Sequence, residues 1–305
     1  MGLPAIPWSE ELDAFRKESS NVTFSTGDLR YNQAYGISYD MYSNQLKPME
    51  CRIEFEDGDI RLEPRNIERL SVMASKIEDR GRVFIGGEAV GFRRSNKWIS
   101  FIKGDDCAWR YDDAKRMDSS IKNHETPGPI EDFTNKRFII VYSTEDLEIL
   151  PMLKRRVFSI KKRLSGLEVG QISGVRFTVK TDSELTDEDL ENSSLWIIGR
   201  IDGSARLDKI QSLIGNTMEN GKLVDARSRS RNSLVQFISP SPYGKNNYVY
   251  VELGSSPISY LCSVMKYIKY DYCVTGLTKS GESILVRGLF DKSWKYDEKL
   301  ANIVN

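Results

Sequence analysis

Few residues of this chain have the types and spacing that enzymatic chemistry requires. His124 is the only histidine among 305 residues, and it stands in a Pro/Gly-rich connector. Histidine is the commonest general base near neutral pH and the commonest metal ligand. The chain also contains no Gly-x-Ser-x-Gly pattern, which would place a serine nucleophile on a strained turn. We therefore expect neither a hydrolytic triad nor a histidine-based metal site.

Carboxylates offer the remaining route to acid and base chemistry. Adjacent pairs of them occur at Asp105 with Asp106, Asp112 with Asp113, and Glu131 with Asp132. Paired carboxylates can act as general acid and base or hold a divalent cation. Nothing else in the sequence indicates a shaped site around them, so we expect them to face water or accept backbone hydrogen bonds. An unconventional or degenerate hydrolase that uses carboxylates is the enzymatic alternative.

Two basic patterns could bind anions. Arg227, Arg229 and Arg231 alternate with serines, and they would share one face of a strand or form an anion clamp in a loop. The runs 154–156 and 161–163 recur seven residues apart, which is typical of the solvated flank of a helix. The arginines favour phosphate, nucleic acid or an acidic neighbouring subunit as ligand, but a plain surface loop explains them more simply.

Net charge argues against a general attraction to polyanions. The 44 basic and 44 acidic residues cancel, so nucleic acid or an anionic membrane would have to bind through a local patch. We expect no nucleic-acid partner and no membrane partner. The N-terminus lacks the basic and apolar regions of a secretory signal, and no segment has the roughly 20 apolar residues of a membrane span. We expect a cytoplasmic protein.

The elements that must position these residues suggest two domains. Up to residue 133, short alternating segments such as 49–55 and 60–63 are separated by Gly, Asp and Asn, and Glu56-Asp57-Gly58-Asp59 predicts a hairpin turn. We expect residues 1–133 to form an antiparallel β-sandwich or jelly-roll-like domain. From residue 134 to residue 305, strands alternate with helices, which predicts an open three-layer α/β domain, Rossmann-like or flavodoxin-like.

An α/β domain of this kind would bind a small ligand where its parallel strands end. Candidates for that crevice are Ser143, Thr144, Asp182 and Arg200, with Gly199 beside them. No glycine-rich turn follows the strand at 138–142, so a dinucleotide site is not expected, and the sequence predicts no cofactor. Ser143 and Thr144 can also cap the helix that follows, and for Ser143 the sequence favours this role over ligand binding.

Short motifs give the chain a resemblance to a known family. In order along the chain they are 66–70, 127–132, the strand and helix from Phe138, 195–199, 240–242 before 248–251, and 288–294. This order resembles the accessory region of prolyl-oligopeptidase-like peptidases, which accompanies an α/β-hydrolase catalytic domain. The nucleophile and histidine of such a domain are missing, so no catalytic residue carries over. The resemblance makes a separate hydrolase subunit a candidate partner.

These observations favour a non-enzymatic protein that binds or assembles. A region related to one that packs on a catalytic partner would expose a surface when alone. We expect self-association into a homo-oligomer, with cyclic symmetry as the starting assumption.

Overall fold

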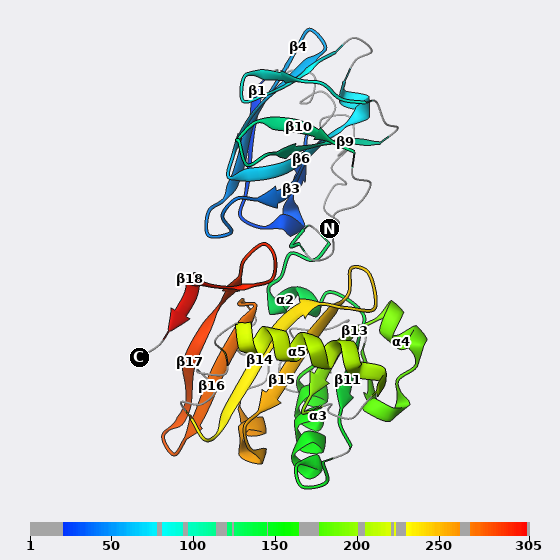
Figure 1. Cartoon of the computed structure of the whole chain (residues 1–305), viewed down its shortest axis with the longest axis vertical. Helices are drawn as coiled ribbons and strands as arrows, with labels where there is room; N and C mark the ends of the chain where they lie inside the picture. Colours follow the sequence, from blue (N-terminus) through cyan, green and yellow to red (C-terminus); the bar gives the residue numbers. More distant parts are fainter. Residues whose placement is uncertain are drawn as a thin grey trace, which may run out of the picture. The chain divides into compact units, whose positions relative to one another are not determined.

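The computed structural model of the protein describes residues 21–77, 81–93, 97–113, 121–123, 125–144, 146–164, 177–200, 205–220, 223, 230–262 and 269–303. The chain divides into two compact units, residues 1–117 and 118–305 (Figure 1). The division that the sequence suggested near residue 133 falls inside the second unit. Lys122 and Ile130 are buried there, and their backbone N–H groups donate to the carbonyls of Lys292 and Tyr270 at 2.8 and 3.1 Å.

Unit 1 contains two five-stranded sheets. The first has the order β1 (Asn21–Thr26), β4 (Met49–Glu56), β5 (Asp59–Arg65), β7 (Val83–Ile85), β8 (Glu88–Val90). The second has the order β10 (Trp109–Asp112), β9 (Trp98–Lys103), β6 (Ile67–Met73), β3 (Ile37–Tyr42), β2 (Gln33–Ala34). Short 3-10 helices occupy Leu29–Tyr31 (η1) and Ala74–Lys76 (η2).

One apolar core lies between these two sheets. Cys51, Ile53 and Leu62 reach it from the first sheet, and Leu70 and Phe101 reach it from the second. The predicted hairpin at 56–59 is confirmed, since β4 and β5 pair through Glu56 and Asp59. Asp57 and Gly58 both have positive φ, of 49° and 81°, as a tight two-residue hairpin turn requires.

Unit 2 is built on one eight-stranded sheet (Figure 1). Its order is β12 (Phe177–Thr181), β11 (Phe138–Tyr142), β13 (Ser194–Ile198), β15 (Tyr248–Gly254), β14 (Ser233–Pro240), β16 (Tyr272–Thr278), β17 (Gly281–Phe290), β18 (Tyr296–Ile303). The four strands from β12 to β15 are parallel to one another. From β15 to β18, each pair of neighbouring strands in this order is antiparallel.

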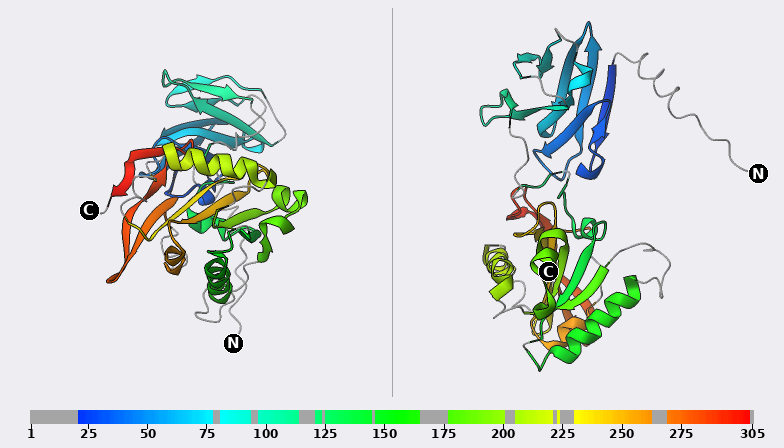
Figure 2. Two further views of the ribbon diagram at one scale, coloured as in Figure 1. Left: turned by 60° about the horizontal axis from the view of Figure 1, so that its bottom comes forward. Right: turned by 90° about the vertical axis from the view of Figure 1, so that its right-hand side faces the viewer.

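Helices flank the sheet of unit 2. Their bounds are α2 Ile130–Phe133, α3 Leu150–Leu164, α4 Asp187–Asn192 and α5 Asp208–Asn220, with 3-10 helices η3 Asp182–Glu184, η4 Ala205–Leu207 and η5 Pro257–Leu261. The two longest, α3 and α5, cover opposite faces, as the right-hand view of Figure 2 shows. Leu153 and Ile160 of α3 pack with Ile140, whereas Ile210 of α5 packs with Ile139. Adjacent residues of β11 therefore enter separate cores, as the alternation of a strand demands.

The predicted fold class is wrong. Of the described residues, 45% are in strands and 23% in helices, and no open three-layer α/β domain of the Rossmann or flavodoxin kind is evident among them. Helices α3 and α5 lie on opposite faces of the sheet in unit 2, but every pair of neighbours after β15 in its strand order is antiparallel. Beyond residue 230, short connections join β14 to β15, β16 to β17 and β17 to β18, and such connections favour antiparallel pairing over right-handed crossovers. Residues 257–261 form the five-residue 3-10 helix η5, and residues 263–268 lie outside the described part.

The antiparallel description of unit 1 also needs correction. Strands β5 and β7 run parallel, with Ile60 opposite Val83. Between these two strands the chain crosses to the other sheet to form β6, so no hairpin constrains them to run in opposite directions.

Candidate functional site

The parallel strands of unit 2 end at one edge of the sheet, which we call the carboxyl edge. Ser143 and Thr144 follow β11, Asp182 follows β12, and Gly199 and Arg200 follow β13. Thr144 Oγ1 donates to Asp182 Oδ1 at 3.2 Å, so the structure brings these two predicted residues into contact. The carboxyl edge is thus where the expected crevice residues gather.

The residues at this edge differ in how far they are exposed to solvent. Ser143 and Asp182 are buried, with 2% and 5% of their surface exposed, whereas Arg200 is exposed. Gly199 has φ +89°, and a Cβ there would lie 2.9 Å from Leu153, so both conformation and space require glycine. In the turn before α3, Asp146 Oδ1 accepts from the backbone N–H groups of residues 148 and 149 at 3.1 and 3.3 Å.

The arginine run meets the same edge. Arg227 and Arg229 lie outside the described residues, but Arg231 is described and exposed, two residues before β14. Because β14 is antiparallel to β15, it starts where β15 ends. Ser255, just beyond β15, donates its Oγ to the carbonyl of Arg231 at 2.8 Å and accepts from the N–H of Ser233 at 2.8 Å. Two features that the sequence presented separately therefore lie on one edge.

Beneath this edge lies a buried ion pair that the sequence reasoning missed. Arg156 on the inner side of α3 makes two parallel hydrogen bonds to Glu252 of β15, Nε to Oε2 and Nη2 to Oε1, both at 2.9 Å. The side chains of Arg156 and Glu252 are only 2% and 0% exposed. Burial alone would lower the pKa of Arg156, but the adjacent carboxylate outweighs it and the pKa is raised.

Neighbouring groups complete the hydrogen bonding of this pair. Gln236 Nε2 and the Tyr250 hydroxyl donate to Glu252 Oε1 at 2.9 and 3.2 Å. Arg156 Nη1 donates to the carbonyl of Cys262, which ties the end of η5 to α3. Glu252 thus accepts four hydrogen bonds, three at Oε1 and one at Oε2. This network fixes the end of strand β15 to helix α3.

Hydroxyl and thiol groups at this edge have structural surroundings. Burial raises the pKa of the Cys262 thiol, which is the opposite of the shift that activates a thiolate nucleophile. Ser255, Ser256 and Ser259 exchange hydrogen bonds among their own hydroxyls and with the chain around Asn232. Within the described residues no three His, Cys, Asp or Glu side chains form a group that could hold a metal ion.

The opposite edge of the same sheet, which we call the amino edge, holds a second buried pair. Lys122 Nζ donates to Asp271 Oδ2 and to the carbonyl of Phe290, and the Phe290 N–H donates to the same Asp271 oxygen at 2.7 Å. Both side chains are essentially unexposed, at 1% and 0%. Burial lowers the pKa of Lys122 and raises the pKa of Asp271. Among the described residues Asp271 Oδ1 finds no hydrogen-bond donor.

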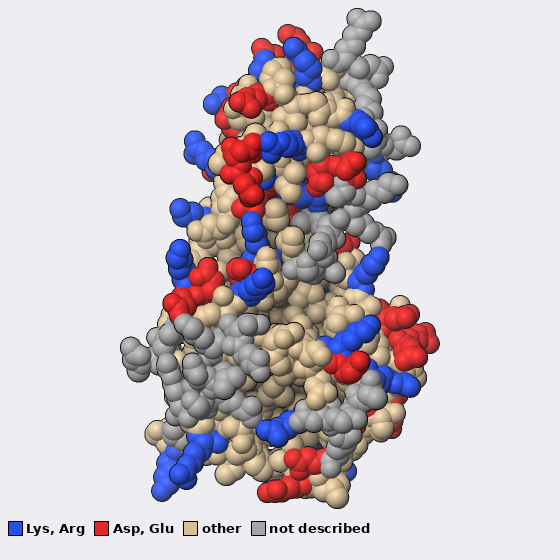
Figure 3. All heavy atoms as spheres, viewed as in Figure 1, with Lys and Arg blue, Asp and Glu red and all other residues tan. Residues whose placement is uncertain are grey.

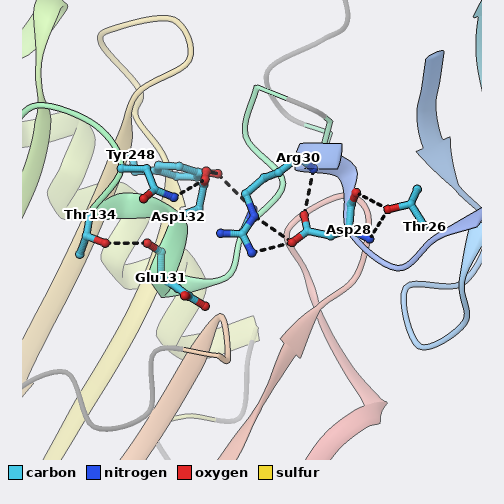
Figure 4. Close-up of polar contacts among 9 residues, drawn as sticks. Thr26, Asp28, Arg30, Glu131, Asp132, Thr134 and Tyr248 are labelled. Atoms are coloured by element: carbon cyan, nitrogen blue, oxygen red, sulfur yellow. Dashed lines mark hydrogen bonds and ion pairs between the residues drawn. The ribbon is translucent and has the colours of Figure 1, made fainter. Parts of the chain in front are cut away.

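Tyr248 holds residues 128–132 at the amino edge through hydrogen bonds of its hydroxyl group. The Tyr248 hydroxyl donates to Asp132 Oδ2 at 2.7 Å and accepts from the Gly128 N–H at 3.0 Å, and Figure 4 shows Tyr248 beside Asp132. Gly128 has φ +66°, and a Cβ there would lie 2.5 Å from Asp271 Oδ1. Asp132 is therefore a structural acceptor, while the Glu131 carbonyl accepts from the Thr134 hydroxyl at 2.8 Å (Figure 4).

The other acidic pairs also have structural partners. Asp112 accepts from Arg69 Nε at 2.8 Å, and Asp106 accepts from Arg110 Nη1 at 2.9 Å. The Arg110 guanidinium, through its hydrogen bonds, lowers the pKa of Asp106. A carboxylate held ionised by a guanidinium is a poor general acid. His124 lies outside the described residues.

Unit 1 carries a hollow of about 440 Å³ on the outer face of its first sheet. Three arginines and three glutamates line it together with Phe84, among them Arg52, Glu54 and Arg61. Arg61 lies 4.4 Å from the centre of the Phe84 ring, and Arg52 pairs with Glu54 at 2.9 Å. The signs cancel within the lining, so this hollow offers no net charge to an anion.

Comparison with known proteins gives no family. No family model matches this chain, and no curated protein matches it. Among the described residues, no helix combines the length and apolar character needed to cross a membrane.

Proposed function

We propose that this is a non-catalytic binding protein whose second unit takes an anionic ligand at the carboxyl edge. The observation that carries the proposal is that the acidic side chains at this edge are buried whereas the arginines are exposed. The buried carboxylates, Asp182 and Glu252, accept internal hydrogen bonds, whereas Arg200 and Arg231 expose their guanidinium groups. Strand β15 separates β13 from β14, so the ends that carry these arginines are roughly 10 Å apart.

An anion with two charged groups fits such a pair of arginines. Guanidinium groups bind phosphate and carboxylate through two parallel hydrogen bonds. The backbone next to Arg231 is held by Ser255, which limits the cost of ordering that arginine on binding. Arg229 and Arg227 stand two and four residues earlier in the sequence, so they add positive charge close to Arg231 along the chain.

Calorimetric titration with pyrophosphate tests this proposal. We expect binding that weakens at least tenfold in Arg231→Gln and in Arg200→Gln, since a charge-assisted hydrogen bond contributes about 1.5–3 kcal/mol. Arg65→Gln, an exposed arginine of unit 1, is the matched control and should bind unchanged. Equal affinity in all three variants, or turnover of ester, peptide or glycoside substrates, would contradict the proposal and favour the carboxylate-based hydrolase.

We also propose that the chain self-associates, with η5 as the supporting observation. Ile258 and Leu261 are 50% and 46% exposed, and residues three apart share one side of a 3-10 helix. Native mass spectrometry should show an oligomer that Ile258→Asp with Leu261→Asp dissociates. Leu46→Asp, at a comparably exposed leucine of unit 1, should leave it intact. A monomer at micromolar concentration would oppose this proposal, and a co-purifying hydrolase would support the accessory-region resemblance instead.

A further inference from the structure

The outer face of α3 combines positive charge with an exposed aromatic ring. Phe158 is 67% exposed on this fifteen-residue helix. Lys154 and Arg155 precede it by four and three residues, and Lys161 and Lys162 follow it by three and four. Residues at these spacings are surface neighbours on a helix. All four cations are exposed, so they surround the ring on the side turned away from the sheet.

The inner face of α3 accounts for its other residues. Leu153, Val157 and Ile160 pack in the core, and Arg156 is bound to Glu252. The helix contains no acidic residue, and within the described part of the chain no carboxylate pairs with Lys154, Arg155 or Lys161. Cations and anions intermingle over the face shown in Figure 3, whereas the sequence of α3 contains six basic residues and no acidic one.

We propose that this outer face of α3 binds the surface of an anionic phospholipid bilayer. The four cations would contact lipid phosphates and carboxylates while Phe158 enters the interfacial layer. A fifteen-residue helix is about 22 Å long, so the cations span about 12 Å and can lie together within the potential of a charged membrane. Helices that lie in the membrane interface combine Lys and Arg side chains with Trp, Phe or Leu side chains that enter the boundary between headgroups and acyl chains.

Single-stranded nucleic acid is the competing partner for cations around one ring. Proteins of that kind use a positively charged groove with several aromatic rings on which successive bases stack. The cations and the ring of this face all project from one helix, which makes the face convex, and it has a single ring. A planar, fluid surface can meet all five side chains at once, so the geometry favours the membrane.

Co-sedimentation of the full-length protein with vesicles tests the proposal. We expect binding to phosphatidylcholine vesicles that contain phosphatidylserine, little binding to phosphatidylcholine alone, and weakening as salt rises. Lys161→Glu with Lys162→Glu should weaken binding at least twentyfold, since each cation near an anionic surface is worth about a fivefold change. Phe158→Ala should weaken it about tenfold, and Phe158→Leu should restore most of that loss.

Controls separate this surface from general charge and from the proposed anion site. Lys103→Glu with Lys245→Glu makes the same change in net charge at exposed positions elsewhere and should bind vesicles as the native protein does. Arg231→Gln should lose pyrophosphate binding yet retain vesicle binding, so the two proposals can fail separately. Absence of vesicle binding at low salt, equal binding by the Lys161/Lys162 and control variants, or tighter binding of an oligothymidine than of vesicles would overturn the inference.

Discussion

The two edges of the sheet in unit 2 each hold a buried ion pair, but they are completed differently. At the carboxyl edge, Arg156 and Glu252 share two hydrogen bonds, and Glu252 accepts two more from Gln236 and Tyr250. At the amino edge, Lys122 Nζ and the Phe290 N–H both donate to Asp271 Oδ2. Both oxygens of Glu252 accept hydrogen bonds, whereas among the described residues only one oxygen of Asp271 does.

The difference shows what each pair contributes. Two buried charges recover their desolvation cost only when geometry and surrounding hydrogen bonds are complete. Arg156 meets this condition because a planar guanidinium matches a carboxylate, whereas an ammonium acts as a point charge. Asp271 keeps one oxygen without a donor among the described residues, and its pKa is raised by burial. The contribution of the amino-edge pair to the free energy of unfolding should therefore depend on pH. The contribution of the carboxyl-edge pair should change chiefly when one of its residues is mutated.

The largest effect should come from Glu252→Gln. The change leaves the Arg156 guanidinium buried without a counter-charge, which costs about 3–5 kcal/mol of the free energy of unfolding. Urea titration at neutral pH measures the loss. The double variant Arg156→Met with Glu252→Leu should recover most of it, because no charge remains buried. The control Glu54→Gln, in an exposed ion pair, should lose less than about 1 kcal/mol of the free energy of unfolding. A loss as small as that in Glu252→Gln would show that the two edges do not differ in this way.

Lys122→Met should cost less at neutral pH, about 2–3 kcal/mol, since Asp271 can bind a proton in place of its partner. Burial already raises the pKa of Asp271, and removal of the lysine raises it further. The native state then binds this proton more tightly than the unfolded state. The resulting stability is present at low pH and is lost as pH rises through the native pKa.

Urea titrations of Lys122→Met and the native protein at several pH values test this sign. The difference in free energy of unfolding between the native protein and Lys122→Met should shrink as pH falls from 8 to 5. Lys245→Met, at an exposed lysine, should show no such trend. A deficit that grows on acidification would refute the assignment of a raised pKa to Asp271.

Tyr248→Phe should have the smallest effect of the three, about 1–3 kcal/mol. It removes a hydroxyl that satisfies Asp132 and the Gly128 N–H but leaves the ring in place. Thermal unfolding compared with Tyr31→Phe, whose ring is 72% exposed, isolates the buried hydroxyl. Equal melting temperatures for the two variants would mean that the amino edge does not depend on this tyrosine.

Local patterns in the sequence predicted more of the strands than of their arrangement. The run 138–142 and the hairpin at 56–59 have strong local signals and are found as strand and turn. The parallel α/β fold was wrong because the order of strands depends on long-range pairing. Strand β14 enters between β15 and β16, and nothing in residues 233–240 alone specifies those neighbours.

The buried pairs show the same limit. Arg156 stands in a basic run that reads as solvated, although its spacing from Leu153 and Ile160 places it on the apolar side of α3. Glu252 is the one acidic residue in a strand of buried aromatic and aliphatic side chains, which is a signal for a buried partner. The partner itself is 96 residues away and could not be inferred from spacing. Lys122 and Asp271 lack even such a local signal.

Arg156 has a mechanical consequence for α3. Apolar contacts have no preferred direction, so a helix held by them alone can shift along a sheet. The two parallel hydrogen bonds from Arg156 to Glu252 have a fixed geometry and therefore set both the position and the orientation of α3 against the central strand β15.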